Sequence, residues 1–113
     1  MKYLLFLYER DTDWESVPAE TLRSALAEHA KFAAYLRERG TEYSGHALRP
    51  STDATTLRRA ADGELLVTDG PYVELTEHIG GIYVIEAADL DEALEIARRC
   101  PTGTGTEIRP IWE

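Results

Sequence analysis

Two segments of the chain are apolar on both faces, which predicts strands that are covered on both sides. In Lys2–Glu9 and Gly81–Glu86, apolar side chains occupy odd and even positions alike. In an extended chain these positions point to opposite faces. Strands of this kind are typical of the interior of a layered structure. We therefore expect both segments to be central strands of one sheet.

A long amphipathic helix is predicted between Pro18 and Gly40. Its apolar positions recur at spacings of three and four residues, which places them on one helical face. This stripe contains Leu22, Leu26, His29, Ala33 and Leu36. We expect Ser16 to cap the helix, Pro18 to lie in its first turn and Gly40 to end it.

A second, shorter helix is predicted to begin at Asp89 and to stop at Pro101. Asp89 is followed three residues later by Glu92, which is typical of a capping box. The apolar stripe of this helix contains Leu90, Ala93, Leu94 and Ala97. Each helix therefore has one apolar face with which to cover a sheet.

The segment between the helices predicts three additional strands. Tyr43–Arg49 and Ala54–Ala60 are separated by a Pro-Ser-Thr-Asp sequence, which is typical of a turn, so we expect them to form a hairpin. Asp62 and Gly63 predict a second turn, which leads into a strand at Glu64–Thr68.

The resulting order predicts a single α+β domain over residues 1–113. A last strand is expected at Glu107–Trp112, where Pro110 indicates a sheet edge or a bulge. Strand, helix, strand group, helix and strand follow one another in the ferredoxin-like plan, βαββαβ with an added hairpin. The chain has 113 residues, which is enough for one hydrophobic core.

Two helices can cover only one face of such a sheet. We therefore expect another body to cover the second apolar face. Exposed apolar area costs about 25 cal/mol per Å² of lost burial. A second copy of the chain is the simplest cover, and most soluble homo-oligomers are two-fold dimers. We therefore expect a homodimer with its sheets packed face to face, a dimeric α/β barrel. The alternative is that the loop Pro71–Ile79 shields this face.

The charge balance and the single cysteine limit the partners and cofactors. With 12 Lys and Arg against 21 Asp and Glu, the formal charge of −9 disfavours nucleic acid and acidic membrane surfaces. The longest apolar run, Tyr3–Tyr8, is too short for a membrane helix. Cys100 is alone, so we expect no intrachain disulfide and a cytoplasmic location. The three histidines show no metal-ligand spacing, and we expect neither metal nor cofactor.

His29 and Asp69 are the candidate catalytic residues. An imidazole on a sheet-facing stripe can act as a general base, because histidine exchanges protons near neutral pH. Asp69 opens a turn that Gly70 and Pro71 make rigid, and it could orient that imidazole. The alternatives are a core histidine bonded to backbone and an aspartate that caps its turn. The sequence spacing does not show that the two side chains meet.

Tyr72, Glu74 and Arg58 are the candidate ligand-binding residues. Tyr72 offers a hydroxyl and Glu74 a carboxyl group close to the same turn, and Arg58 can reach an anionic ligand. The alternatives are a core aromatic side chain, a solvated charge and an arginine that pairs with the excess acid.

Several segments together resemble the YCII-related family, specifically its DGPF branch. They are Lys2–Leu5, Ala54–Arg58, Thr68–Tyr72 with Glu74, Glu77 and Gly80–Gly81, Asp89–Ala93, Arg98 with Pro101, and Glu107–Pro110. The resemblance implies a dimeric α/β barrel. A neighbouring branch has been linked to dehalogenation of aromatic rings by a His and Asp pair, and some relatives are fused or adjacent to sigma factors.

Three positions depart from the pattern of that branch. Tyr72 stands where phenylalanine is usual, and Leu75–Thr76 replaces a Thr-Lys pair, which removes a lysine that could contact a ligand anion. His46 stands where an acidic residue is usual.

The expected function is that of a homodimeric domain that binds a small molecule. For this domain we expect proton-transfer or lyase-type chemistry, with His29 as the base and Asp69 as its orienting partner. The alternative is a non-catalytic module for dimerisation or partner docking in regulation, which the same fold can also provide.

Overall fold

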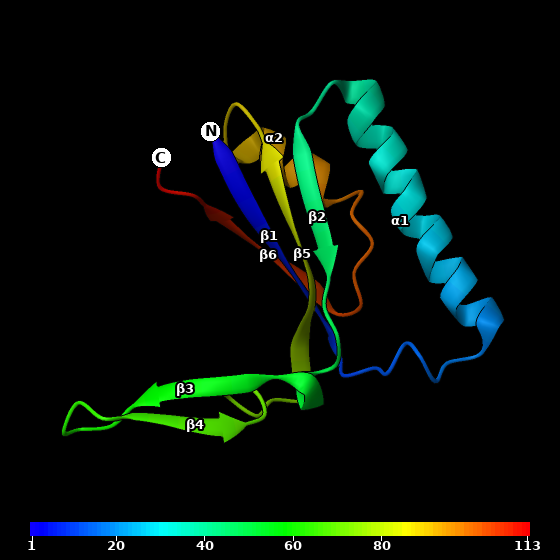
Figure 1. Cartoon of the computed structure of the whole chain (residues 1–113). Helices are drawn as coiled ribbons and strands as arrows, with labels where there is room; N and C mark the ends of the chain where they lie inside the picture. The colour runs from blue at the N-terminus through cyan, green and yellow to red at the C-terminus, as the bar shows by residue number, and fades with distance from the viewer.

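The computed structural model describes residues 1–113 as a mixed α+β structure with two helices and antiparallel sheets (Figure 1). In chain order, the elements are β1 (Lys2–Arg10), α1 (Ala19–Arg39), β2 (Tyr43–Ala47), the short 3-10 helix η1 (Ser51–Asp53), β3 (Thr55–Arg59), β4 (Leu65–Asp69), β5 (Glu77–Glu86), α2 (Leu90–Ala97) and β6 (Gly105–Pro110). The predicted mixed α+β class is confirmed.

Four strands form the main sheet in the order β2-β5-β1-β6, and all neighbours are antiparallel. This order is compatible with the ferredoxin-like plan, with β3 and β4 inserted between its second and third strands. As the sequence predicts, β1 and β5 are the central strands. β6 lies at the edge, where the missing N–H of Pro110 costs least.

The predicted hairpin between residues 43–49 and 54–60 is wrong. β2 pairs with β5, and β3 pairs instead with β4 through the turn at Asp62–Gly63. Gly63 adopts a φ of 88°, a conformation that favours glycine. The physical reason for the difference lies in η1, which turns the chain after Pro50 across the end of the main sheet, so that β3 does not run back along β2 (Figure 1). A hydrogen bond from the Asp53 N–H to the Pro50 carbonyl oxygen closes this turn.

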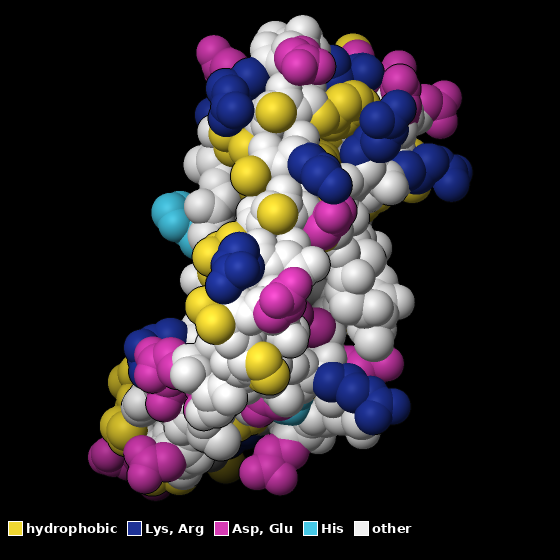
Figure 2. Space-filling model, turned by 90° about the vertical axis from the view of Figure 1, so that its right-hand side faces the viewer, with side chains coloured by type: hydrophobic (Ala, Val, Ile, Leu, Met, Phe, Trp, Pro, Cys, Tyr) yellow, Lys and Arg dark blue, Asp and Glu magenta, His cyan; other side chains and the backbone are white.

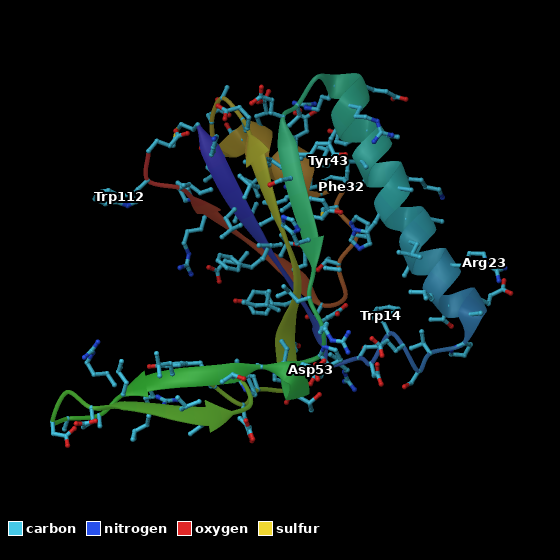
Figure 3. The ribbon with its side chains drawn as sticks, in the orientation of Figure 1. Trp14, Arg23, Phe32, Tyr43, Asp53 and Trp112 are labelled. Atoms are coloured by element: carbon cyan, nitrogen blue, oxygen red, sulfur yellow. The ribbon has the colours of Figure 1, made fainter.

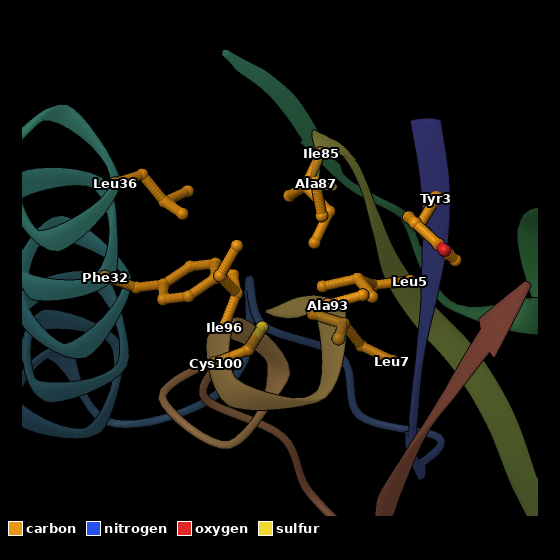
Figure 4. Close-up of a cluster of buried hydrophobic side chains, with 10 residues drawn as sticks. All are labelled: Tyr3, Leu5, Leu7, Phe32, Leu36, Ile85, Ala87, Ala93, Ile96 and Cys100. Carbon is orange, nitrogen blue, oxygen red and sulfur yellow. The ribbon is translucent and has the colours of Figure 1, made fainter. Parts of the chain in front are cut away.

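Both helices contribute to one hydrophobic core on one face of the main sheet. Figure 4 shows the buried cluster, in which Phe32 and Leu36 of α1 face side chains of the sheet and α2. The cluster contains Tyr3, Leu5, Leu7, Phe32, Leu36, Ile85, Ala87, Ala93, Ile96 and Cys100. The odd-numbered residues of β1 therefore face the helices.

The apolar stripes predicted for the two helices are only partly correct, because each helix is rotated about its axis relative to the prediction. On α1, Leu36 is buried as expected, but Leu26 is 61% exposed and Phe32 takes a central place in the core. On α2, Ala93 is buried as expected, but Leu90 is exposed and Ile96 is buried. Each residue turns a helix by about 100°, so a small rotation of the helix exchanges one set of buried apolar positions for another. Contacts with the sheet decide which set is buried.

The predicted helix ends are confirmed at Gly40, Asp89 and Pro101, whereas Pro18 is the N-cap of α1 and does not lie in its first turn. Gly40 ends α1 with a φ of 73°, and Asp89 caps α2 by accepting a hydrogen bond from the Glu92 N–H at 2.9 Å. Pro101 lies beyond the end of α2. Ser16, however, does not cap α1, because its hydroxyl instead donates to the Asp13 carboxylate at 2.6 Å.

Because the Cys100 thiol is buried, we expect the folded protein to lose stability at alkaline pH. Burial raises the pKa of its thiol from 9.0 to about 12. Between these values the unfolded chain loses the thiol proton and the folded chain keeps it, so stability falls as the pH rises. This effect amounts to about 2 kcal/mol between pH 8 and 10.5. Denaturant unfolding at pH 8 and 10.5 measures it, and Cys100→Ala should show a smaller loss over the same interval. An equal loss in both proteins would contradict this attribution.

The second face of the main sheet, which we call the open face, has no helix against it. Its residues follow from the strand register: Leu4, Phe6, Tyr8, Ile79, Ile82 and Val84, with Ser44, His46, Glu107 and Arg109 at the flanks. These apolar side chains are only half-buried. In contrast, Figure 2 shows that the surface on the α1 side mixes acidic, basic and isolated apolar side chains.

The β3–β4 hairpin, residues 55–69, extends away from the main sheet as an arm (Figure 1). It projects from one end of the sheet, on the side opposite to α1. Its two strands pair only with each other. Four large apolar side chains of the arm are exposed, namely Leu57, Leu65, Leu66 and Val67. The main sheet and the arm thus enclose a corner in front of the open face.

Candidate functional site

His29 contacts the main sheet through Tyr83 of β5. Its Nδ1 atom lies 2.8 Å from the Tyr83 hydroxyl, and the two rings are stacked with centroids 6.0 Å apart. Phe32 packs edge-on against the same tyrosine. Burial raises the pKa of the Tyr83 hydroxyl to about 12, so this group stays neutral in the physiological range. His29 therefore has a side-chain hydrogen-bond partner at the sheet.

Gly45 of β2 leaves the space that the Tyr83 ring occupies. A Cβ atom at position 45 would lie 2.4 Å from the nearest ring atom, well inside van der Waals contact. Gly45 and Tyr83 are directly paired across β2 and β5, on the side that faces the helices. A glycine in β2 thus permits the contact between Tyr83 and His29.

Replacing Gly45 by alanine is expected to displace the Tyr83 ring and to destabilise the fold by about 1–3 kcal/mol, as overpacking does. Denaturant unfolding measures this loss, and an absorbance titration should show the pKa of a tyrosine moving toward 10 as its ring is exposed. Gly105→Ala is the matched control, because a Cβ atom there would meet nothing within 4 Å. Equal stability of both variants would contradict the packing role of Gly45.

The structure does not bring Asp69 to His29. Asp69 is the last residue of β4, at the base of the arm, whereas His29 lies on α1 and contacts β5. No hydrogen bond or ion pair joins their side chains. The predicted pairing is therefore absent within one chain, because the hairpin carries Asp69 away from the helix-covered face.

Asp69 instead lines a hollow where the arm meets the main sheet. A groove of about 530 Å³ is lined by Tyr8, Leu48, Arg49, Pro50, Ser51, Asp53, Ala54, Pro71, Tyr72, Val73, Leu75, Glu77, His78 and Ile79. A neighbouring hollow of about 350 Å³ is lined by Ser51, Thr52, Asp69, Gly70, Pro71, Glu74, Leu75 and His78. The two share four residues, and we call them together the junction groove.

Three predicted site residues, Asp69, Tyr72 and Glu74, thus belong to one groove. Another predicted site residue, Arg58, contacts the wall of this groove: its guanidinium donates to the Tyr72 carbonyl oxygen at 2.7 Å and lies 4.1 Å from the centre of the Tyr72 ring. Arg58 therefore supports Tyr72.

His78 is the histidine that the structure places in the junction groove. It lies at the start of β5 and lines both hollows. Close to it, Ser51 donates from its N–H and its hydroxyl to the Asp11 carboxylate. These two hydrogen bonds hold the pKa of Asp11 below its usual value, and the charge of His78 adds to this effect. The imidazole of the groove thus has the fixed carboxylate of Asp11 near it.

The charge of the junction groove is predominantly negative. Four carboxylates line it, from Asp53, Asp69, Glu74 and Glu77, together with a single guanidinium, that of Arg49. Arg49 is already paired with Asp53 and with Glu15, at 2.8 Å in each case. Figure 3 shows Asp53 near the junction of the arm with the main sheet. No lining arginine or lysine is left over for an anionic ligand.

Comparison with known families gives a match along the whole chain. The family model described as the YCII-related domain matches residues 1–113. The chain belongs to the YCII-related domain family. This confirms the resemblance seen in the sequence at the level of the family.

The YCII-related domain also has a curated relative in Rhizobium meliloti (strain 1021), an uncharacterised protein. The two are 46% identical over 68 residues, which is 57% of this chain and 54% of the relative. The chain thus spans about half the length of this relative. Neither helix of the YCII-related domain is both long and apolar enough to cross a membrane.

Sequence reasoning did not select His78 as a site residue of this YCII-related domain. The segment Glu77–Ile79 was expected to belong to a loop, whereas β5 begins at Glu77. The available signal was the position of His78 two residues before Gly80–Gly81, close to the predicted Asp69 turn. Only the pairing of β5 with β1 and the turn at η1 show that His78 and Asp69 line one groove.

Proposed function

We propose that this YCII-related domain is a homodimer that binds a small molecule in the junction groove. The observation that carries the proposal is the groove itself. Its larger hollow, of about 530 Å³, lies within the size range of small-molecule sites, about 300–1,000 Å³. Apolar walls from Tyr8, Val73 and Ile79 combine with a few polar groups, as is typical of such sites.

The lining favours a ligand with an apolar body and without a negative charge. An anionic ligand would meet four carboxylates, while the lining arginine is paired with two carboxylates. A neutral hydroxyl or an ammonium group would find acceptors in Asp69 and Glu74. Phenols, alcohols and amines with an aromatic or aliphatic body therefore fit the groove better than carboxylic acids or phosphates.

Proton-transfer chemistry on such a ligand would use His78 as the base. Its imidazole would take a proton from the ammonium group of a bound ligand, which leaves a neutral amine in the groove, and Asp69 and Glu74 would stabilise the imidazolium that forms. This assigns to His78 the role that the sequence suggested for His29. His29 is expected to act through Tyr83 on the packing of α1, and its variant serves as a comparison below.

The homodimer is supported by the surface that one chain leaves exposed. A monomer of 12.7 kDa has an expected accessible surface of about 6,200 Å². The single chain exposes 8023 Å². The difference of about 1,800 Å² exceeds the ~800 Å² per partner that a standard stable interface buries. The open face and the arm contain the apolar surface that a second copy would cover, which supports a dimeric α/β barrel.

Three probes with a shared phenyl body test the ligand assignment: 2-phenylethanol, 2-phenylethylamine and 3-phenylpropionate. Backbone amide NMR spectra should shift at groove residues with the alcohol and the amine, and at least about tenfold more weakly with the carboxylate. The double variant Asp69→Asn, Glu74→Gln should reduce this discrimination. His78→Ala should weaken binding, whereas His29→Ala should leave it unchanged. If none of the three probes shifts groove resonances, the proposed site is wrong and the non-catalytic module is favoured.

A further inference from the structure

We propose that Trp112 of one protomer packs against the hairpin arm of its partner and closes the partner's junction groove. This inference rests on the proposed homodimer and specifies its geometry. Trp112 is 99% exposed, which is unusual for so large an apolar side chain. The arm also has exposed apolar side chains, so Trp112 of one protomer and the arm of the other could bury each other.

The arm does not join the main sheet, and its side-chain contact with the neighbouring segment is that of Arg58 with Tyr72. β3 and β4 pair only with each other, and Leu57, Leu65 and Val67 are 57%, 48% and 69% exposed. A two-stranded hairpin without further packing is at best marginally stable in water. The apolar side chains of the arm therefore indicate a surface that another body covers.

Trp112 and the arm lie at opposite ends of the main sheet but on the same side of it. Figure 1 shows the arm leaving one end of the sheet and the C-terminus at the other end. Figure 3 shows Trp112 directed away from the sheet, toward the side to which the arm also projects. Both features thus flank the open face.

A two-fold axis that packs the two open faces together with their ends reversed brings each arm to the partner's Trp112. Packed sheets are separated by about 10 Å, and a five-residue strand spans about 17 Å. The arm, whose strands have five residues each, is therefore long enough to cross the space between the sheets and reach the partner. In this arrangement the partner's C-terminal end lies over the corner that contains the junction groove.

The second possible two-fold arrangement keeps both arms at the same end of the dimer. The two arms would then project into the same space, and both Trp112 side chains would stay at the other end without an arm to contact. The end-reversed arrangement covers both features, so it is the one that we infer. It also makes the binding site composite, because the partner supplies one wall.

Chemical cross-linking tests the contact directly. The variant Val67→Cys, Glu113→Cys carries one thiol on the arm and one beside Trp112, which it retains. A short bismaleimide should convert this variant to a covalent dimer, and neither single variant should react in this way. The native thiol, Cys100, is buried. The control Leu26→Cys, Glu113→Cys, with its first thiol on the exposed surface of α1, should stay uncross-linked.

The outcomes separate this inference from the proposed homodimer. Cross-linking that needs both cysteines supports the contact. A dimer without this cross-link, or a covalent dimer from Val67→Cys alone, overturns the contact and leaves the homodimer standing. A chain that is monomeric overturns both.

Fluorescence gives a second readout that needs no cysteine. In Trp14→Phe, Trp112 is the single tryptophan. Its emission should be shifted to the blue at concentrations where the chain is dimeric and should move to the red on dilution. Trp112→Ala should weaken dimerisation at least about tenfold, because buried tryptophans are frequent hot spots of interfaces. Emission that stays red in a dimer would contradict burial of Trp112 at the arm.

Discussion

Replacing Phe32 by alanine is expected to destabilise the protein by about 3–5 kcal/mol. Phe32 is 2% exposed and packs edge-on against Tyr83 and beside Tyr35, so alanine leaves a cavity between α1 and the sheet. A small domain has a total stability of about 5–15 kcal/mol, so this loss would bring it close to unfolding. Urea denaturation followed by far-UV circular dichroism measures the effect.

The matched control for Phe32 lies on the same helix. Leu26 is 61% exposed, and Leu26→Ala is expected to change the stability by less than about 0.5 kcal/mol. Because both substitutions truncate an apolar residue of α1 to alanine, they differ chiefly in burial. A larger loss in Leu26→Ala than in Phe32→Ala would contradict the observed rotation of α1 and favour the stripe predicted from the sequence.

Replacing Val84 by aspartate is expected to raise the dissociation constant of the homodimer by at least about a thousandfold. Val84 lies on the open face, in register with Leu4 on one side and Ser44 on the other. A second copy over this face would bury the new carboxylate without a partner, which costs several kcal/mol. Sedimentation over a concentration series measures the shift.

Two controls accompany Val84→Asp. Leu26→Asp makes the same kind of change on the exposed surface of α1 and should leave dimerisation unaffected. Circular dichroism should show that Val84→Asp keeps its helices, because its side chain is outside the core between helices and sheet. A Val84→Asp variant that dimerises like the unchanged protein would show that the open face is not the interface.

Local patterns were sufficient to predict most elements of the main sheet and both helices. Tyr3, Leu5 and Leu7 alternate with a second apolar set, and this pattern correctly identified β1 as a central strand. Asp89 with Glu92, and Gly40, correctly marked helix ends, because their effects act within one turn of the chain.

Pairing between distant segments could not be read from such patterns. Residues 43–47 carry turn signals after them, which suggested a hairpin with the next strand, yet β2 forms its ladder with β5. The same limit applies to Phe32: two apolar stripes are possible on α1, and only contact with Tyr83 and the sheet selects one.

In the candidate site, too, the local arrangement was predictable from the sequence and the contacts between distant segments were not. Asp69, Tyr72 and Glu74 follow one another around a turn, so their shared location was predictable. His29 on an apolar stripe was the natural partner by residue type, but the inserted hairpin carries Asp69 to His78 instead. The insertion thus determines which histidine can serve the site.

Sedimentation velocity of the unchanged protein at micromolar concentration tests the central claim most directly, namely that a second copy covers the open face. The account predicts one species of twice 12.7 kDa, which dissociates only on strong dilution. A stable species of 12.7 kDa across the whole micromolar range would contradict it, because the open face, the arm and Trp112 would then all stay in contact with water.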